Sequence, residues 1–398
     1  VRRLQELARE KKVPLYACFI DLQKAYDSVD RTLLWDLLAR YGIPAKMISV
    51  IREFHDGMRA CVRLGSGETS EWFNVEQGLR QGCVLAPLLF NIFFTAVLWV
   101  AYDRFAAEED VRRDFVYIAA RGQGGKDRGK ELWAMLYADD AGVVSKSVAS
   151  LAKMMTAIVR VCEGFGLTVA ERKTETVYLH YPGAAEQALV IEAAGQTYKQ
   201  TDKFVYLGGA ISSMGDIQPE LKRRVGFAWG SLKKYNRQVY NNVEVPLADK
   251  IRLLNAEALE ILLYGCVTWT LAPNDLAKLR ECHRGLLQRC IGEYRKRTGT
   301  DADFHQMSYR DALVKTGCES IEATVRKRTL LLYAGRVACM GDYRLPNIVM
   351  RGELVGGARR AGRPPRQLQD CVKEYLRDFG IEEKSWMEAA RRGGGVLP

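Results

Sequence analysis

The sequence predicts an α+β domain followed by an all-helical region. Apolar segments short enough for strands alternate with helical patterns as far as about residue 210, and from residue 216 the pattern is helical for most of the chain. The charge divides in the same way, because residues 1–220 carry 27 Lys and Arg against 28 Asp and Glu, whereas residues 221–398 carry 32 against 20. A basic helical half is typical of a domain that grips a polyanion, although solvated helix faces give the same composition.

Strands and helices are predicted in a regular order at the start of the chain. Leu4–Lys12 predicts a short amphipathic helix, and Leu15–Leu22 predicts a buried strand that carries an acid near its end. Asp30 is expected to cap the next helix, which ends near residue 42, and a second helix is expected from about residue 45 to residue 58.

A hairpin and a long apolar helix come next. Residues 61–64 and 72–75 flank a glycine-bearing turn, which predicts the hairpin. The longest apolar run, Val84–Tyr102, is interrupted by Pro87 and Asn91. We therefore expect a buried helix there rather than a membrane span.

The middle of the chain predicts a loop and then a second hairpin. Residues 106–130 are charged and rich in glycine near their end, so we interpret them as an insertion or a mobile loop. Residues 132–138 and 141–145 are apolar on both sides of two adjacent aspartates, which predicts a tight hairpin. A helix is expected over residues 148–165, and Pro and Gly at residues 356–365 predict a linker before the last helix.

The cysteines do not form a recognisable metal or disulfide framework. The ten cysteines include no CxxC pair, and the group Cys282, His283 and Cys290 lacks a fourth ligand at zinc-site spacing. We expect reduced thiols in an intracellular protein, in the nucleus or the cytoplasm. The chain starts with Val in a helical pattern and has no signal peptide, so we expect it to be a piece of a longer protein.

Asp139 and Asp140 are the most informative residues. They lie inside the otherwise apolar segment Met135–Val144, where two adjacent carboxylates repel each other and lose hydration. Divalent cations would neutralise them, and Mg²⁺ prefers carboxylate oxygens together with substrate phosphates. The alternative is a solvated acidic pair at a hairpin tip, because Asp is common in turns.

A third carboxylate follows an earlier apolar strand. If the strand that leads to Asp21 lies beside the hairpin of Asp139 and Asp140, the three acids can hold two metal ions roughly 4 Å apart for phosphoryl transfer. The alternative for Asp21 is a helix cap or a turn. Asp27 and Asp30 are expected to have structural roles of that kind.

The segment Phe19–Val29 (FIDLQKAYDSV) resembles the first palm motif of reverse transcriptases from non-LTR retrotransposons. In that family the acid binds metal and the aromatic residue five positions later stacks against the incoming sugar. The resemblance therefore implies that Asp21 binds metal and that Tyr26 excludes a 2′-hydroxyl. The alternative for Tyr26 is packing in the core.

Three further segments resemble the next motifs of the same family, in the same order. Gly78–Pro87 resembles the second motif and implies that Gln81 and Gly82 lie against the nucleotide and the template, although Ala86 stands where the family usually has Ser. Tyr137–Asp140 resembles the third. Gly166–Thr174 resembles the fourth and implies that Lys173 protonates the departing pyrophosphate, although Ala170 stands where Asn is common.

The resemblance also implies a domain order. It assigns residues 1–12 to a remnant of the fingers, residues 13–215 to a right-hand polymerase palm built on an antiparallel sheet, with an insertion at 106–130, residues 216–300 to a thumb, and residues 301–398 to a basic C-terminal helical region.

The predicted thumb is where nucleic acid is expected to bind. The residues expected to contact the phosphates of the template and primer are basic and lie on its first helices: Lys222, Arg223, Arg224, Lys233 and Lys234. The aromatic residues between them, Trp229, Tyr235 and Tyr240, are expected to be core residues because of their helical spacing.

The predicted function is RNA-directed DNA polymerisation, with an RNA template, a DNA primer, deoxynucleoside triphosphates and two Mg²⁺ or Mn²⁺ ions. The upstream fingers and an endonuclease domain are expected outside this chain, so we expect weak or no synthesis from it alone. The alternatives are a truncated, inactive retroelement remnant that only binds nucleic acid, a non-enzymatic nucleic-acid-binding protein, and another two-metal enzyme such as a nuclease. Tyr26 and Gln81 argue against the nuclease.

Overall fold

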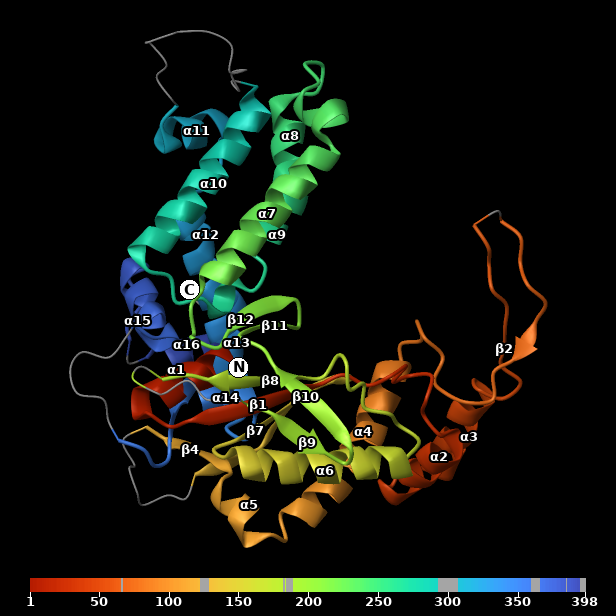
Figure 1. The fold of residues 1–398 in the computed structure, drawn as a ribbon. Coiled ribbons are helices and arrows are strands. Elements are labelled where there is room, and N and C mark those ends of the chain that lie inside the picture. Colours follow the sequence, from red (N-terminus) through yellow and green to blue (C-terminus); the bar gives the residue numbers. More distant parts are fainter. Residues whose placement is uncertain are drawn as a thin grey trace. The chain divides into compact units, whose positions relative to one another are not determined.

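The computed structural model describes residues 1–65, 67–121, 129–181, 183, 189–292, 307–358, 366–383 and 385–393. Strands and helices are mixed up to residue 212, and helices predominate after it, which confirms the predicted α+β class (Figure 1). The chain forms two compact units. The sheet unit is Val13–Tyr117 with Arg128–Asp202, and the helical unit is Val1–Lys12, Ile118–Asp127 and Lys203–Pro398.

The sheet unit is built on a six-stranded sheet in the order β6-β7-β1-β8-β10-β9. Neighbouring strands are antiparallel except for β8 and β10, which are parallel. Every residue of the central strand β1 is buried, because neighbouring elements cover both faces of the strand. The strands are β1 Leu15–Ile20, β6 Ala134–Tyr137, β7 Asp140–Ser145, β8 Glu175–Leu179, β9 Ile191–Ala193 and β10 Gln196–Gln200. The short strand β5 Lys130–Leu132 comes just before β6 in the chain and is not part of this sheet.

Helices pack against this sheet and form one hydrophobic core with it. Tyr16, Cys18 and Ile20 of β1 share that core with the apolar faces of α4 and α6. By length and composition α4 is long and apolar enough to cross a membrane. Half of its most apolar stretch of residues is nevertheless buried inside the fold, as occurs in core helices of globular domains. The helices are α2 Arg31–Arg40, α3 Ala45–Glu53, α4 Ala86–Phe105, α5 Glu109–Arg113 and α6 Val148–Gly164.

Several local predictions are confirmed in this unit. The Asp30 side chain caps α2 by accepting a hydrogen bond from the Leu33 amide at 3.0 Å. The predicted early hairpin is formed by β2 Arg59–Ala60 and β3 Phe73–Asn74. The interpretation of residues 106–130 as a loop is wrong for the described part, which contains α5 and the strand β4 Val116–Ala120. Val111 and Phe115 are fully buried and anchor this charged stretch.

Among its described residues, the helical unit has two hydrophobic cores. One lies between α7, α8, α10, α11 and α12, and the other between the end of η4, α13, α15 and α16. The helices are α7 Gln218–Lys234, η1 Asn236–Tyr240, α8 Leu247–Leu254, η2 Asn255–Leu259, α9 Glu260–Leu262, η3 Cys266–Thr268, α10 Pro273–Ile291, α11 Tyr309–Thr316, α12 Ile321–Lys327, η4 Arg328–Ala334, α13 Gly335–Cys339, α14 Leu345–Arg351, α15 Leu368–Asp378 and α16 Trp386–Arg392. Most of the predicted linker at 356–365 lies outside the described residues.

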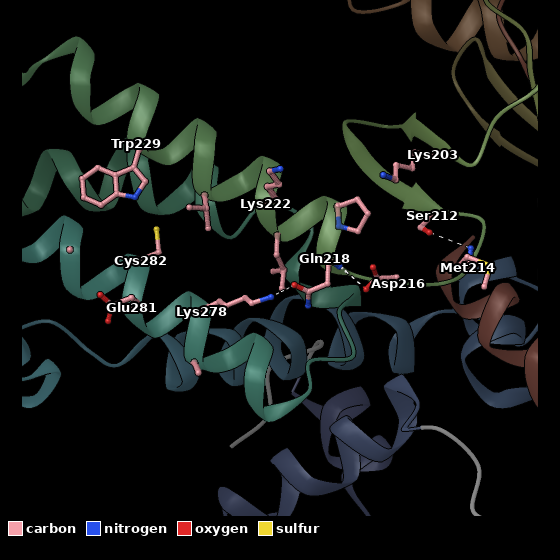
Figure 2. A pocket seen from close by; sticks show the side chains of 15 residues that line it. Lys203, Ser212, Met214, Asp216, Gln218, Lys222, Trp229, Lys278, Glu281 and Cys282 are labelled. Atoms are coloured by element: carbon pink, nitrogen blue, oxygen red, sulfur yellow. Dashed lines mark hydrogen bonds between the residues drawn. The ribbon is translucent and has the colours of Figure 1, made fainter. Parts of the chain in front are cut away.

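Two antiparallel strand pairs and a groove are further features of this unit. β11 Lys203–Tyr206 pairs with β12 Gly209–Ser212, and β13 Gly352–Leu354 pairs with residues 118–120 of β4. A groove of about 1100 Å³ runs between α7 and α10, and its lining includes Lys222 and Trp229 (Figure 2).

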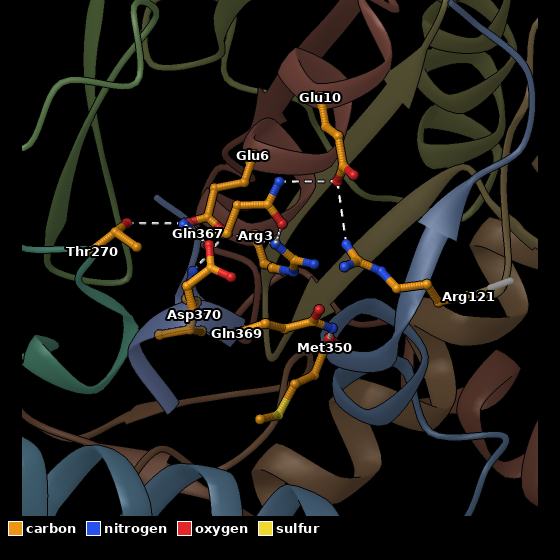
Figure 3. Close-up of polar contacts among 10 residues, drawn as sticks. Arg3, Glu6, Glu10, Arg121, Thr270, Met350, Gln367, Gln369 and Asp370 are labelled. Atoms are coloured by element: carbon orange, nitrogen blue, oxygen red, sulfur yellow. Dashed lines mark hydrogen bonds and ion pairs between the residues drawn. The ribbon is translucent and has the colours of Figure 1, made fainter. Parts of the chain in front are cut away.

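The first helix, α1 Arg2–Lys11, belongs to the helical unit and is joined to its C-terminal part by buried polar contacts. Arg3 donates a hydrogen bond of 2.8 Å to the Gln367 side chain, and Gln367 donates one of 3.0 Å to Glu10. Arg121 forms an ion pair of 3.3 Å with Glu10 (Figure 3). Because Arg3 is only 5% exposed, these contacts make α1 an integral element of this unit.

Candidate active site

Three carboxylates gather at one end of the sheet. Ile20 of β1 pairs with Ala141 of β7, so the next residues along the two antiparallel strands, Asp21 and Asp140, lie at the same sheet edge. Asp139 lies in the two-residue turn between β6 and β7, because Tyr137 pairs with Asp140. The strand register therefore brings the three acids to the same end of the sheet.

The turn that carries Asp139 is strained. Ala138 adopts a φ of +53°, in the left-handed region that non-glycine residues rarely occupy. A tight hairpin with the right-handed twist of the flanking strands requires positive φ in its turn. The cost of this conformation, roughly 1–3 kcal/mol, is typical of functional sites that a surrounding fold holds in place.

The electrostatics of the site link the three acids. Burial, together with the charges of Asp139 and Asp21, raises the pKa of Asp140 above the usual carboxyl range. One oxygen of Asp21, Oδ1, is buried without a hydrogen-bond donor. Among the described residues, however, no three His, Cys, Asp or Glu side chains form a ready-made metal cage. The charges of the three acids influence one another, but their carboxylates do not converge on one position where an ion could be held by all three.

Lys173 lies beside Asp21, as the fourth motif implied. Its Nζ is 3.4 Å from Asp21 Oδ1, and its side chain is 70% exposed. The backbone brings the two together, because the Ala170 amide donates to the Asp21 carbonyl at 2.8 Å and the Asp21 amide donates to Thr174 Oγ1 at 3.3 Å. At Ala170 the main chain, rather than a side chain, forms the contact to the first motif.

Tyr26, the residue assigned to the sugar, lies next to the acids. Its ring stacks on Phe90 of α4 with 4.9 Å between ring centroids. Burial and the charge of Asp139 raise the pKa of the Tyr26 hydroxyl, which places the ring in the field of the acidic turn. Tyr26 is thus partly a core residue and partly a wall of the site.

The loop that carries Gln81 and Gly82 is fixed to the first motif. The Leu79 amide donates to the Tyr26 carbonyl at 2.8 Å, and Gln81 Nε2 donates to Asp27 Oδ1 at 3.1 Å. Gly82 is exposed, with a φ of +81° and open space around the position of a side chain. It leaves room for close approach of a ligand to the backbone.

The basic residues of α7 divide into two classes. Lys222, Lys233 and Lys234 are exposed, whereas Arg224 is only 6% exposed and forms an ion pair of 2.7 Å with buried Glu220. The prediction that Arg224 contacts phosphates is therefore corrected: its guanidinium also donates to the Gly208 carbonyl and supports the turn between β11 and β12.

Arg223 is intermediate between these classes. It is half-buried and donates to the same Gly208 carbonyl at 2.8 Å. The aromatic residues Trp229, Tyr235 and Tyr240 contribute to the helical core, which confirms their predicted role. All ten cysteines lie in the described residues and are free thiols.

Sequence reasoning did not identify Arg31 as a residue of this site. Its guanidinium donates to three backbone carbonyls, those of Gln77, Gly78 and His55. The acceptors are 24 to 47 residues away along the chain, so no local pattern signals them.

A family model for reverse transcriptase (RNA-dependent DNA polymerase) matches residues 2–211. The chain belongs to this family. The resemblance to non-LTR retrotransposon enzymes is thereby confirmed, because similar proteins include the Pol polyproteins of retrotransposable elements R2 from Nasonia vitripennis and Drosophila melanogaster. Reverse transcriptases generally use divalent metal ions.

These relatives differ in how much of their length the chain matches. The chain is 28% identical to the Nasonia polyprotein over 54% of its own length and 20% of the relative, and 24% identical to the Drosophila one over 52% and 19%. It thus spans about a fifth of these polyproteins. It is also 24% identical to an uncharacterized transposon-derived protein of Caenorhabditis elegans, over 66% of the chain and 97% of that protein.

Similar solved structures include telomerases. Apo telomerase from Candida tropicalis aligns over 97% of this chain and 55% of its own, with 13% identity and a TM-score of 0.40. Telomerase from Candida albicans, in complex with a fragment of telomeric RNA, aligns over 80% and 53%, with 14% identity and a TM-score of 0.40.

Proposed function

We propose that this chain carries the polymerase site of a retrotransposon reverse transcriptase, which adds deoxynucleotides to a primer 3′-hydroxyl on an RNA template. The observation that supports this most directly is the β1–β7 register, which brings Asp21 and Asp140 to one sheet edge with Asp139 in the adjoining turn. Family membership supports the same activity.

The three acids fit a divalent-metal site by their chemistry. Asp21 Oδ1 is buried and accepts no hydrogen bond, with the Lys173 ammonium 3.4 Å away, and the pKa of Asp140 is raised by burial and by two neighbouring negative charges. Both conditions would be relieved by cations held by Asp21, Asp139 and Asp140. When bound, two Mg²⁺ or Mn²⁺ ions stabilise the attacking and the leaving oxygens of nucleotidyl transfer.

The other residues have roles in binding and proton transfer. Tyr26, supported by Phe90, forms a wall that excludes a 2′-hydroxyl, and Gln81 and Gly82 contact the nucleotide and the template. Lys173 Nζ holds a proton close to Asp21 and donates it to the departing pyrophosphate. Its exposure leaves the ammonium free to move from the carboxylate to a phosphate.

The helical unit contributes phosphate contacts in this proposal. Lys222, Lys233 and Lys234 are exposed on or near α7 and bind the backbones of the RNA template and the DNA primer. The domain order implied by the motifs, with fingers before the palm and an endonuclease elsewhere in the polyprotein, belongs to the same proposal.

The test is incorporation of deoxynucleotides on poly(rA)/oligo(dT) with Mg²⁺ or Mn²⁺. We expect Asp139→Asn and Asp140→Asn to abolish it, by about 10²-fold or more, because removal of a transition-state charge contact has effects of that size. Asp36→Asn is the matched control, since Asp36 is exposed on α2. Equal activity of the wild type, Asp139→Asn and Asp36→Asn would contradict the assignment.

The second candidate is a retroelement remnant that binds nucleic acid without catalysis. The ion pair between Lys173 and Asp21, and the lack of a closed three-acid cage among the described residues, favour it. Binding of Mn²⁺ measured by electron paramagnetic resonance separates the two. A catalytic site binds Mn²⁺ in the wild type and loses it in Asp139→Asn, whereas a remnant binds nucleic acid equally well in both and binds no Mn²⁺ at this position.

A further inference from the structure

The segment that connects β1 to α2 and the loop Gln77–Gly82 are joined by a dense set of hydrogen bonds. The Gly78 amide donates to the Val29 carbonyl at 3.0 Å, the Leu79 amide to the Tyr26 carbonyl at 2.8 Å, and Gln77 Nε2 to the Ser28 carbonyl at 2.9 Å. The first two are main-chain contacts, which hold the loop whatever side chains it carries, and the third depends on the Gln77 side chain.

Arg31 adds a second connection from the same segment. Its Nε donates to the Gly78 carbonyl at 2.8 Å, its Nη2 to the Gln77 carbonyl at 3.2 Å, and its Nη1 to the His55 carbonyl just beyond α3 at 3.1 Å. The planar guanidinium thus joins the residue just beyond α3 to the loop that carries Gln81, and a lysine ammonium cannot reproduce this geometry. Burial lowers the pKa of Arg31, as expected for a guanidinium held within the fold.

A pocket of about 490 Å³ lies between these two parts. Its walls are Phe54 and His55 on one side and the loop residues from Arg80 to Leu85 on the other. His55 is 2% exposed, and its Nδ1 lies 2.9 Å from the Ile51 carbonyl and donates to it, whereas its Nε2 is buried and makes no hydrogen bond.

We propose that Arg31 is a positioning residue for nucleotide binding. By holding the His55 carbonyl and the carbonyls of Gln77 and Gly78 on one guanidinium, it fixes the separation of the two walls and the place of Gln81 and Gly82 in the pocket. This inference rests on the proposed function, because it takes the pocket to receive a nucleotide. Arg31 itself touches no reacting atom.

The test compares Arg31→Ala and Arg31→Lys with the control Arg40→Ala, which changes an exposed arginine in the last turn of the same helix. Hydrogen exchange at the amides of Gly78 and Leu79 is the first readout. We expect Arg31→Ala to speed it about tenfold, with Arg31→Lys nearly as affected, while β1 and β7 keep wild-type exchange.

The second readout is steady-state incorporation of deoxynucleotides. We expect Arg31→Ala to raise KM for the nucleotide about tenfold and to change kcat less, because the metal-binding acids stay in place. Unchanged exchange at Gly78 and Leu79, or an equal rise throughout the sheet unit, overturns the positioning role. If the wild type neither incorporates deoxynucleotides nor binds Mn²⁺ at the three acids, the proposed function fails, and the exchange result alone decides on Arg31.

Discussion

Gly78→Ala is the substitution with the most sharply defined consequence in the sheet unit. Gly78 has a φ of +82°, and a Cβ at this position would lie 2.6 Å from both the Cα and the carbonyl oxygen of Asp27. Both atoms belong to the backbone, so no side chain can rotate away to make room. The loop or the segment around Asp27 must shift.

The expected loss of stability has two parts. The left-handed conformation costs alanine about 1–2 kcal/mol. The shift also breaks the hydrogen bonds from the Gly78 and Leu79 amides to Val29 and Tyr26, at about 1 kcal/mol each. Together these give about 3–4 kcal/mol. Gly82→Ala is the matched control, because Gly82 has nearly the same φ of +81° but nothing within 4 Å of the added Cβ, so only the conformational part of about 1–2 kcal/mol applies.

Urea unfolding followed by tryptophan fluorescence gives the free energy of unfolding of both variants. Because a chain of two units need not unfold in one step, hydrogen exchange is used to show that the loss of stability lies in the sheet unit. A free energy of unfolding for Gly78→Ala equal to that of Gly82→Ala would refute the reasoning. It would show that the loop is not pressed against Asp27, and the attachment of the nucleotide loop to the first motif would lose its main support.

Three further outcomes follow from charges in the fold. Because the pKa of Asp140 is raised in the fold, the charged carboxylate opposes folding at pH values above the usual carboxyl pKa. Asp140→Asn should therefore stabilise the metal-free chain at pH 7 by about 0.5–1 kcal/mol, measured by urea unfolding. It should also remove the part of the stability that the wild type loses as pH rises. Burial lowers the pKa of His283 to about 4, so the helical unit should lose up to about 1.4 kcal/mol per pH unit as pH falls from 6.5 toward 4, and His283→Asn should flatten this slope. Arg224→Ala should cost up to about 3 kcal/mol, because buried Glu220 then keeps only the Ala210 amide and the more distant guanidinium of Arg223, 3.8 Å away. Lys222→Ala should leave the free energy of unfolding within about 0.5 kcal/mol of the wild type and lower the salt slope of nucleic-acid binding by about one.

The acids of the site could be predicted because each of them has a local signal. Asp21 and Asp140 adjoin apolar strands, and adjacent carboxylates in an apolar segment are costly unless something neutralises them. Their proximity follows once two such strands are neighbours in antiparallel register. The helix cap at Asp30 and the core role of Tyr240 are equally local, because capping preference and helical spacing decide them.

Features that depend on distant partners could not be predicted. β4 was missed although Val116–Ala120 (VYIAA) is a short apolar run, because charged residues surround this run and the strand it pairs with, β13, lies more than 200 residues later. Arg224 was grouped with exposed lysines because a cluster of basic residues does not indicate which face of a helix packs. The available signal was Glu220, four residues earlier, since Glu–Arg pairs at that spacing face each other.

The segment between β1 and α2 explains why the motifs occur together although they are far apart in sequence. Its first residue, Asp21, forms main-chain hydrogen bonds to Ala170 and Thr174, close to Lys173. The Tyr26 carbonyl in its middle accepts a hydrogen bond from the loop that carries Gln81 and Gly82. Arg31, the first residue of α2, donates to the same loop. One stretch of backbone therefore sets the distances between the three acids, Lys173 and the loop that carries Gln81 and Gly82. Substitutions at residues that contact this segment share partners, so their effects on activity should combine non-additively. The effects of one substitution in the site and one in α7 should instead be additive.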